Sequence, residues 1–207
     1  YIVSGLSPGK GGVPKLLEYL QHNSSENFKL ISPPKLIVKN KYLNYTIQWT
    51  ILKIFRIRLL LLLNKTVILI HFQSIGLKTS KYLIKKNKAY LYLIDNTFFC
   101  LKSYNNRDEN ECLDCLRDYS NSIKNNCSSF HFKYSKLEYI SFYKFLKTHT
   151  HKINFLTLSD TQSKLLKENL SLNISVQSLY FLTDDLINRQ NSKVKSEKCT
   201  YDIVFHG

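Results

Sequence analysis

Four symmetrically spaced cysteines are the residues of this chain whose types most directly indicate chemistry. They follow the pattern C-x11-C-x2-C-x11-C within a polar stretch, at Cys100, Cys112, Cys115 and Cys127. Four thiolates that include one C-x-x-C pair can fill the tetrahedral coordination of a structural zinc ion and order a segment too polar to form its own core. Zinc ribbons usually carry two such pairs, so free thiols are the main alternative and a disulfide pair is the third. Cys199 stands apart and is expected to be an ordinary small residue.

A glycine-rich turn, SPGKGGVPK at residues 7–15, is a second candidate site. Glycines there let the backbone approach a ligand closely, and the free N–H groups at the start of the following helix attract an anion. Pro14 fits the first turn of that helix, where a missing N–H costs nothing. The turn is neither a G-x-G-x-x-G motif nor a P-loop. We take Lys10, Gly11 and Gly12 as candidate binding residues, with a plain structural turn as the alternative.

Histidines supply the other candidate side chains. His71 ends the apolar run TVILIHF, where a group facing a ligand is expected in an α/β sheet, although a structural histidine explains it equally well. His149 and His151 lie near a predicted helix end, where cationic side chains interact favourably with the helix dipole, so we interpret them as structural. No Ser-His-Asp set and no carboxylate pair has a readable geometry.

The elements that must position these residues alternate along the chain. Strands are predicted at 1–5, 28–32, 66–72, 89–95, 154–159 and 175–181, and helices at 14–22, 42–63, 76–87, 135–150 and 161–170. The internal runs VILI and YLYLI are apolar on both faces, as buried parallel strands are. Repeated strand and helix units predict a Rossmann-like, doubly wound parallel α/β sheet with a cysteine-rich insertion. In such a sheet the ligand lies at the carboxyl ends of the strands.

Positive charge is concentrated in the first half of the chain. The formal net charge is +15, and thirteen basic residues and no acidic residue lie between Asn27 and Ile94. This half should attract phosphate-bearing partners such as nucleic acid, anionic lipid or nucleotide-linked substrates, although a biased genome composition explains the same excess.

The longest apolar stretch, at residues 46–63, is interrupted by Lys53, Arg56 and Arg58. Crossing a bilayer requires an apolar run of about 20 residues, so this stretch is not expected to span one. It either lies in a membrane interface or packs against the sheet with its basic edge exposed.

Taken in order, these motifs resemble the amino-terminal domain of glycosyltransferase family 4, whose members are retaining enzymes built of two Rossmann-like domains. The family has a Gly-Gly pair and an apolar residue in its first loop, matched here by Gly11, Gly12 and Val13. Its later His-Asp-aromatic-aromatic-x-Cys segment is matched by DNTFFC at residues 95–100, with Asp95 at the histidine position and Asn96 at the aspartate position. The segment FLTLSDTQSKLLKENL is similar as well, with Ser159 directly after the strand.

The resemblance implies a glycosyltransferase that moves a sugar from a nucleotide-sugar donor to a glycan or lipid-linked acceptor, in cell-surface polysaccharide or lipopolysaccharide synthesis. It implies no catalytic metal, and it places the protein in the cytoplasm or peripherally on the inner face of the cell membrane. Asp95 is then the catalytic candidate. The substrate-binding candidates are Lys10, Gly11, Gly12, His71, Asn96 and Ser159.

Two domains are expected on the same basis. Residues 1–200 would form the amino-terminal domain, with the cysteine-rich insertion at 97–130, and YDIVFHG at 201–207 resembles the first strand of the family's nucleotide-sugar-binding second domain. The chain begins with Tyr1 and contains no methionine, so we expect a fragment or a processed chain. Without the second domain, which supplies most donor contacts in the family, the chain alone should be inactive.

A zinc-containing nucleic-acid-binding protein is the alternative function. In it the basic stretch would follow phosphates, and the cysteines would shape a recognition surface. The basic and aromatic residues of the first half lie within apolar strands and helices rather than in a separate arm, which favours the glycosyltransferase and argues against a nucleic-acid partner.

Overall fold

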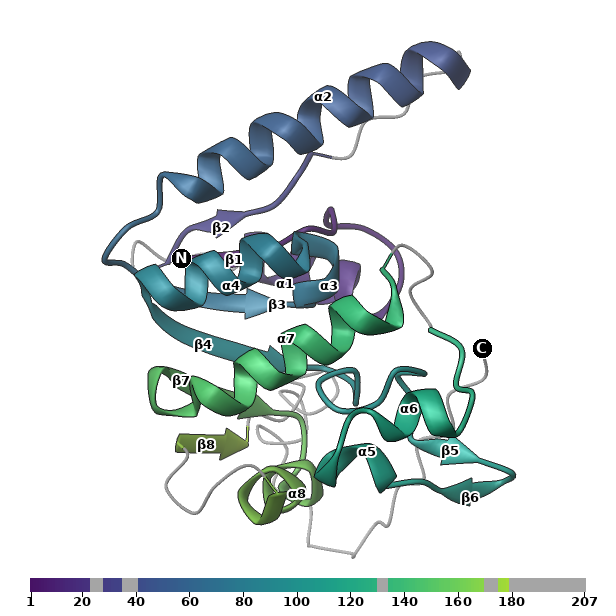
Figure 1. Ribbon diagram of the computed structural model, residues 1–207. Coiled ribbons are helices and arrows are strands. Elements are labelled where there is room, and N and C mark those ends of the chain that lie inside the picture. Colours follow the sequence, from purple (N-terminus) through teal and green to yellow (C-terminus); the bar gives the residue numbers. More distant parts are fainter. Residues whose placement is uncertain (23–27, 35–40, 130–133, 170–174, 179–207) are drawn as a thin grey trace, which may run out of the picture.

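A computed structural model describes residues 1–22, 28–34, 41–129, 134–169 and 175–178 (Figure 1). Its centre is a six-stranded sheet in which every neighbouring pair of strands is parallel. From edge to edge the strand order is β2-β1-β3-β4-β7-β8. The strands are β1 (Ile2–Ser4), β2 (Leu30–Ile31), β3 (Thr66–Ile70), β4 (Lys88–Leu93), β7 (Ile153–Thr157) and β8 (Ser175–Ser178). The Rossmann-like α/β architecture predicted from the alternating runs is therefore confirmed.

Side chains of β3 show why these runs form buried strands. Val67 and Leu69 belong to one apolar core, whereas Ile68 and Ile70 belong to a second core on the opposite face of the sheet. A parallel strand that is covered on both faces requires such a continuous apolar run. The sheet is therefore the middle layer of the molecule.

Helices cover both faces of this sheet. Leu17 of α1 is completely buried in the second core, and the other long helices contribute to the first core. All five helical stretches predicted from the sequence are present. The helices along the sheet are α1 (Gly12–His22), α2 (Lys41–Leu60), α3 (Phe72–Ile75), α4 (Leu77–Lys86), α7 (Lys136–Thr148) and α8 (Asp160–Asn169), with a 3-10 turn, η1, at Thr150–Lys152.

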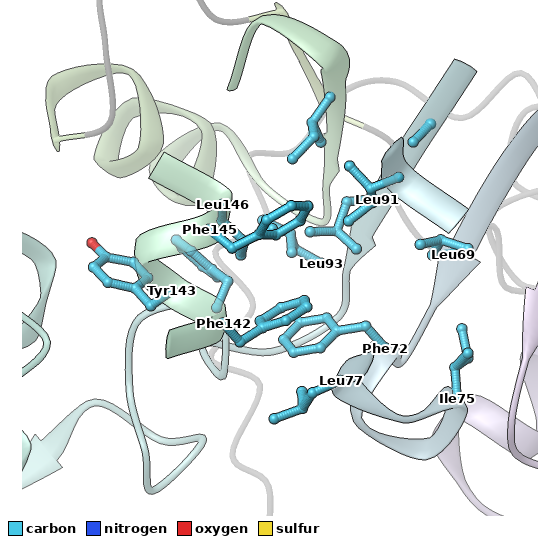
Figure 2. Packing of buried hydrophobic residues seen from close by; sticks show 14 of the residues in the cluster. Leu69, Phe72, Ile75, Leu77, Leu91, Leu93, Phe142, Tyr143, Phe145 and Leu146 are labelled. Carbon is cyan, nitrogen blue, oxygen red and sulfur yellow. The ribbon is translucent and has the colours of Figure 1, made fainter. Parts of the chain in front are cut away.

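The first and larger core lies between the sheet and α7 (Figure 2). Phe72 of α3 stacks on Phe142 of α7 with the ring centroids 4.8 Å apart, and Leu69 and Leu91 approach from the strands. An aromatic pair of this kind contributes about 0.5–1.5 kcal/mol beyond the burial of its area. This pair fixes α7 against the end of β3.

The start of α7 is set by a local signal in the sequence. The hydroxyl of Ser135 accepts a hydrogen bond from the backbone N–H of Glu138 at 3.2 Å, and the Glu138 carboxylate accepts one from the backbone N–H of Ser135 at 2.9 Å. This reciprocal arrangement is a capping box, which satisfies two backbone donors that a helix start leaves without partners. At the other end His149 caps the helix, as its interpretation as a structural residue predicts.

The outermost helix, α2, combines a buried side with an exposed apolar one. Phe55 and Leu59 are buried in the first core, while Ile54 and Ile57 are about half exposed. Figure 1 shows α2 beyond β2 and α4, on the outside of the molecule. Of the two placements that the sequence left open for this stretch, the structure shows the one in which it packs against the core. No helix among the residues described here combines the length and the apolar character that crossing a bilayer requires.

Between β4 and α7 the chain forms several short elements. They are the antiparallel hairpin of β5 (Asn106–Arg107) and β6 (Asn110–Glu111), followed by α5 (Asp114–Arg117) and α6 (Asn121–Lys124). Cys115, Leu116 and Tyr119 attach this segment to the first core. The predicted strand at 201–207, the proposed domain boundary at 200 and Cys199 lie outside the described residues.

Candidate functional site

The strand order reverses between β1 and β3, and this reversal marks the candidate site. From β1 the chain passes to β2 on one side, and then crosses to β3 on the other side of β1. In open α/β sheets ligands bind outside the carboxyl ends of the strands at such a switch point. The loop at residues 5–11 follows β1 and His71 follows β3, so both candidates flank this point.

The glycine turn lies at the solvent-exposed start of α1. Lys10, Gly11 and Gly12 are exposed, and α1 begins at Gly12. Gly11 has φ +103°, a left-handed conformation that strains residues with a side chain, so glycine is needed there for the backbone itself. A Cβ at Gly12 would meet no atom within 4 Å, so the space beside Gly12 is open.

His71 adopts a left-handed backbone at the end of β3, with φ 55° and ψ 64°. The Ser74 hydroxyl fixes this corner, because it donates a hydrogen bond to the His71 carbonyl at 2.7 Å and accepts one from the backbone N–H of Gly5 at 3.0 Å. A Cβ at Gly5 would lie 2.1 Å from the Ser74 carbonyl oxygen, so only glycine lets the end of β1 approach α3 this closely. Left-handed residues other than glycine are uncommon and are enriched at functional sites.

Asp95 organises the loop that follows β4. Its Oδ1 accepts a hydrogen bond from the backbone N–H of Thr97 at 3.0 Å and another from the Thr97 hydroxyl, and its Oδ2 accepts one from the Ser103 hydroxyl at 3.0 Å. Thr97 in turn accepts a hydrogen bond from the buried side-chain amide of Gln73 in α3. Both oxygens of the Asp95 carboxylate are thus engaged within the protein, and a catalytic role for this residue stays a prediction.

Ser159 and Asn96 are connected through Gln162. The Ser159 hydroxyl accepts a hydrogen bond from the Gln162 backbone N–H at 3.2 Å, which caps the start of α8. The Gln162 side-chain amide donates to the backbone oxygen of Asp95 at 3.1 Å and to Oδ1 of Asn96 at 3.3 Å. Its own oxygen accepts from the Leu158 N–H at 3.1 Å. This buried glutamine therefore joins the loops after β4 and β7.

Three residues that matter for this edge were missed from the sequence, namely Gly5, Ser74 and Gln162. Only weak signals pointed to them: a glycine directly after a strand marks a close backbone approach, and the S-x-x-Q spacing from Ser159 to Gln162 is typical of a helix start. Gln162 connects Asp95, Asn96 and Ser159 with one another. Ser74 and Gly5 connect the turn after β1 with His71. Lys10, Gly11 and Gly12 stand at the same edge, where the Lys15 N–H donates to the Gly11 carbonyl at 2.8 Å in the first turn of α1.

The four cysteines are free thiols that influence one another. Burial, which has the largest effect, and the nearby thiols of Cys100, Cys127 and Cys112 together raise the pKa of the Cys115 thiol to about 12. Burial likewise raises the pKa of the Cys100 thiol, with Cys127 and Cys112 adding to the effect. Among the described residues, no three His, Cys, Asp or Glu side chains already form a group that could hold a metal ion.

A shallow basic hollow of about 720 Å³ lies at the opposite edge of the sheet. It is near the amino ends of β3, β4 and β7, and its lining includes Lys65, Lys85, Lys86, Lys88 and Lys152. Several of these lysines belong to the acid-free stretch of the sequence. The hollow is on the far side of the sheet from the switch point, so it is not part of the candidate site.

Comparison with family models, curated proteins and solved structures finds no match to this chain.

Proposed function

We propose that this chain is the acceptor-side domain of a glycosyltransferase that uses a nucleotide-sugar donor. The observation that carries the proposal is the position of the glycine turn and His71 on the two sides of the point where the strand order reverses. Sheets of this kind host many functions, so the argument rests on the groups at the edge rather than on the fold. The resemblance to glycosyltransferase family 4 supplies the reaction class.

The groups at this edge are assigned as follows. Backbone N–H groups at the start of α1 and the Lys10 ammonium approach the donor diphosphate, since a helix start attracts anions. His71 faces the sugar from the neighbouring strand. Asn96 and Ser159 lie farther along the edge, near the acceptor, and Asp95 either acts on the sugar or holds the loop that contains Asn96.

The acceptor side also accounts for the exposed face of α2. Ile54 is 53% exposed and Ile57 is 52% exposed, and both lie on α2 among the exposed Lys53, Arg56 and Arg58. A helix that exposes apolar side chains among cations suits the interface of an anionic membrane. A glycan or lipid-linked acceptor at the inner face of the cell membrane would then be presented to the carboxyl edge of the sheet.

Nuclear magnetic resonance of the isotope-labelled protein tests the proposal, with UDP-glucose and GDP-mannose as probes. We expect amide shifts at Gly11, Gly12 and His71, and we expect Gly12→Val to weaken binding at least about tenfold, which is about 1.4 kcal/mol. Lys164→Val places the same side chain at an exposed site on α8 and should leave binding unchanged.

Two results would overturn the proposal. One is the absence of shifts around the glycine turn with every nucleotide sugar at millimolar concentration. The other is a response to single-stranded RNA, centred on Lys85, Lys86 and Lys88 and lost at high salt. That response would favour the nucleic-acid-binding alternative, in which the basic hollow contacts phosphates.

A further inference from the structure

The cysteine module, defined here as residues 100–127, is held together by hydrogen bonds rather than by a core of its own. Its first half is closed around Asn105, whose carbonyl accepts a hydrogen bond from the backbone N–H of Cys112 at 2.7 Å. The Cys100 thiol donates to the carbonyl of the preceding residue, Tyr104, at 3.6 Å. Cys100 and Cys112 are therefore both bound to the same short stretch of backbone.

Asp114 closes the second half of the module. Its backbone oxygen accepts a hydrogen bond from the Asn121 side chain at 2.9 Å, and its carboxylate accepts one from the Asn125 side chain at 2.9 Å. These two bonds place both ends of α6 against the start of α5. Cys115 follows Asp114 directly, and Cys127 donates from its thiol to the Asn125 carbonyl at 3.9 Å. Cys127 is thus connected through Asn125 to Asp114, the residue next to Cys115.

The two halves meet on the first core. Cys115 is 6% exposed within it, and Cys100 and Cys127 pack against it while partly accessible. The module is also tied to α7, because the Tyr143 hydroxyl donates a hydrogen bond to the Leu116 carbonyl at 2.7 Å. Figure 2 shows the Tyr143 side chain pointing away from the other labelled side chains. One buried cysteine is an ordinary small apolar residue. Three cysteines from separate turns of a polar segment that meet at one core, with a fourth, Cys112, bound to the backbone beside Cys100, require another explanation.

The structure points to a structural zinc site whose four ligands are the thiolates of Cys100, Cys112, Cys115 and Cys127. Thiolates are the ligands that favour zinc over hard cations, and four of them close the tetrahedron and leave no position for a catalytic water. Because the described thiols do not already form a metal-binding group, the ion has to draw them together when it binds. The site would fix the module beside the loop of Asp95 and Asn96, and it does not depend on the proposed function.

Binding exchanges protons for metal. Four thiols lose four protons to solvent and form four Zn–S bonds, and no oxidant or reductant takes part. Because the ligands are thiolates, protons compete with the ion, and zinc affinity should fall as pH decreases.

Elemental analysis tests the site on protein purified without chelator and then dialysed with equimolar zinc. We expect about one zinc per chain, since four thiolates fill one tetrahedral site. Cobalt(II) in place of zinc should give the intense thiolate-to-metal absorption of a four-sulfur site. Cys112→Ser and Cys127→Ser should each lower zinc retention after dialysis at least about tenfold, since each removes one of four ligands. Cys199→Ser, outside the module, should retain the metal fully.

Alkylation of the unmutated protein keeps the test independent of folding in the variants. With zinc bound, an iodoacetamide time course read by mass spectrometry should show the partly accessible Cys100, Cys112 and Cys127 protected, and a chelator should remove that protection. Zinc at trace level after dialysis, iron in its place, or equal alkylation with and without zinc would each overturn the assignment.

Discussion

The Gln162 side-chain amide donates a hydrogen bond to the backbone oxygen of Asp95 at 3.1 Å, joining the residues that follow two adjacent strands. The same amide reaches Oδ1 of Asn96, and its carbonyl accepts from the Leu158 N–H. One buried side chain therefore sets the relative position of two loops at the edge where we place the substrate.

Replacing Gln162 should destabilise the protein. Gln162→Leu leaves the Asp95 carbonyl and the Leu158 N–H without this partner in a largely buried place, which costs about 1–3 kcal/mol for such a group. Urea denaturation measures the loss, and Thr161→Ala at the neighbouring exposed position is the control. Equal midpoints for the two variants would show that solvent replaces these bonds without cost.

Two glycines of the first loop should respond oppositely to the same change. In Gly5→Ala the new methyl group would lie 2.1 Å from the Ser74 carbonyl oxygen, so the backbone must move, at a cost of about 1–3 kcal/mol or more. In Gly12→Ala the methyl group meets no atom within 4 Å, and stability should hold within about 0.5 kcal/mol. Thermal unfolding of both variants makes the comparison, and an unchanged melting temperature for Gly5→Ala would refute this account of the corner.

The stabilisation that the capping box gives to the start of α7 should depend on pH. The Ser135 backbone N–H and then its hydroxyl hold the pKa of Glu138 below its usual value. Since the folded state lowers this pKa, the stabilisation is present above the pKa that the carboxyl has in the unfolded chain, and it is lost as the pH falls through the lower folded value. Glu138→Gln should therefore lose less stability on acidification than the unmutated protein. Parallel curves of unfolding free energy against pH would contradict the capping role.

Attraction to membranes should depend on salt. The charges on α2 are exposed, so the protein should co-sediment with vesicles that contain anionic phospholipid at low salt. Less protein should co-sediment at higher ionic strength, because the screening length falls to about 10 Å at 0.1 M. Arg58→Glu should weaken this binding, whereas Lys167→Glu on the exposed side of α8 should change it little. Equal sedimentation with neutral vesicles would remove the electrostatic argument.

Strands and helices were readable from the sequence because their signals are local. The apolar run at 66–70 and the Ser135 to Glu138 spacing each lie within one element, so periodicity and capping find them. The order of the strands is not a local property, because the residues of β1 contain no signal that it lies between β2 and β3. The corner of Gly5 with Ser74 and the bond from Gln162 to Asp95 join residues far apart in the chain, and spacing does not encode such contacts. For the same reason the spacing of the cysteines identified four candidate residues, but it did not predict the hairpin and the short helices among which they lie.

The place of β1 in the sheet has a consequence for the order in which the protein assembles. β1 is made before β2 and β3, yet Val3 pairs with Ile31 on one side and with Leu69 on the other, so β1 must wait for both later strands. Thr66 and Lys88 of β3 and β4 are separated only by the short helices α3 and α4, so their pairing closes the smallest loop between neighbouring strands of the first half. We expect this pair to form the folding nucleus and β1 to enter last among the three. In pulse-labelled hydrogen exchange, amides of Leu69 and Leu91 should gain protection before that of Val3, and a ribosome-bound chain that ends before β4 should remain open to proteases.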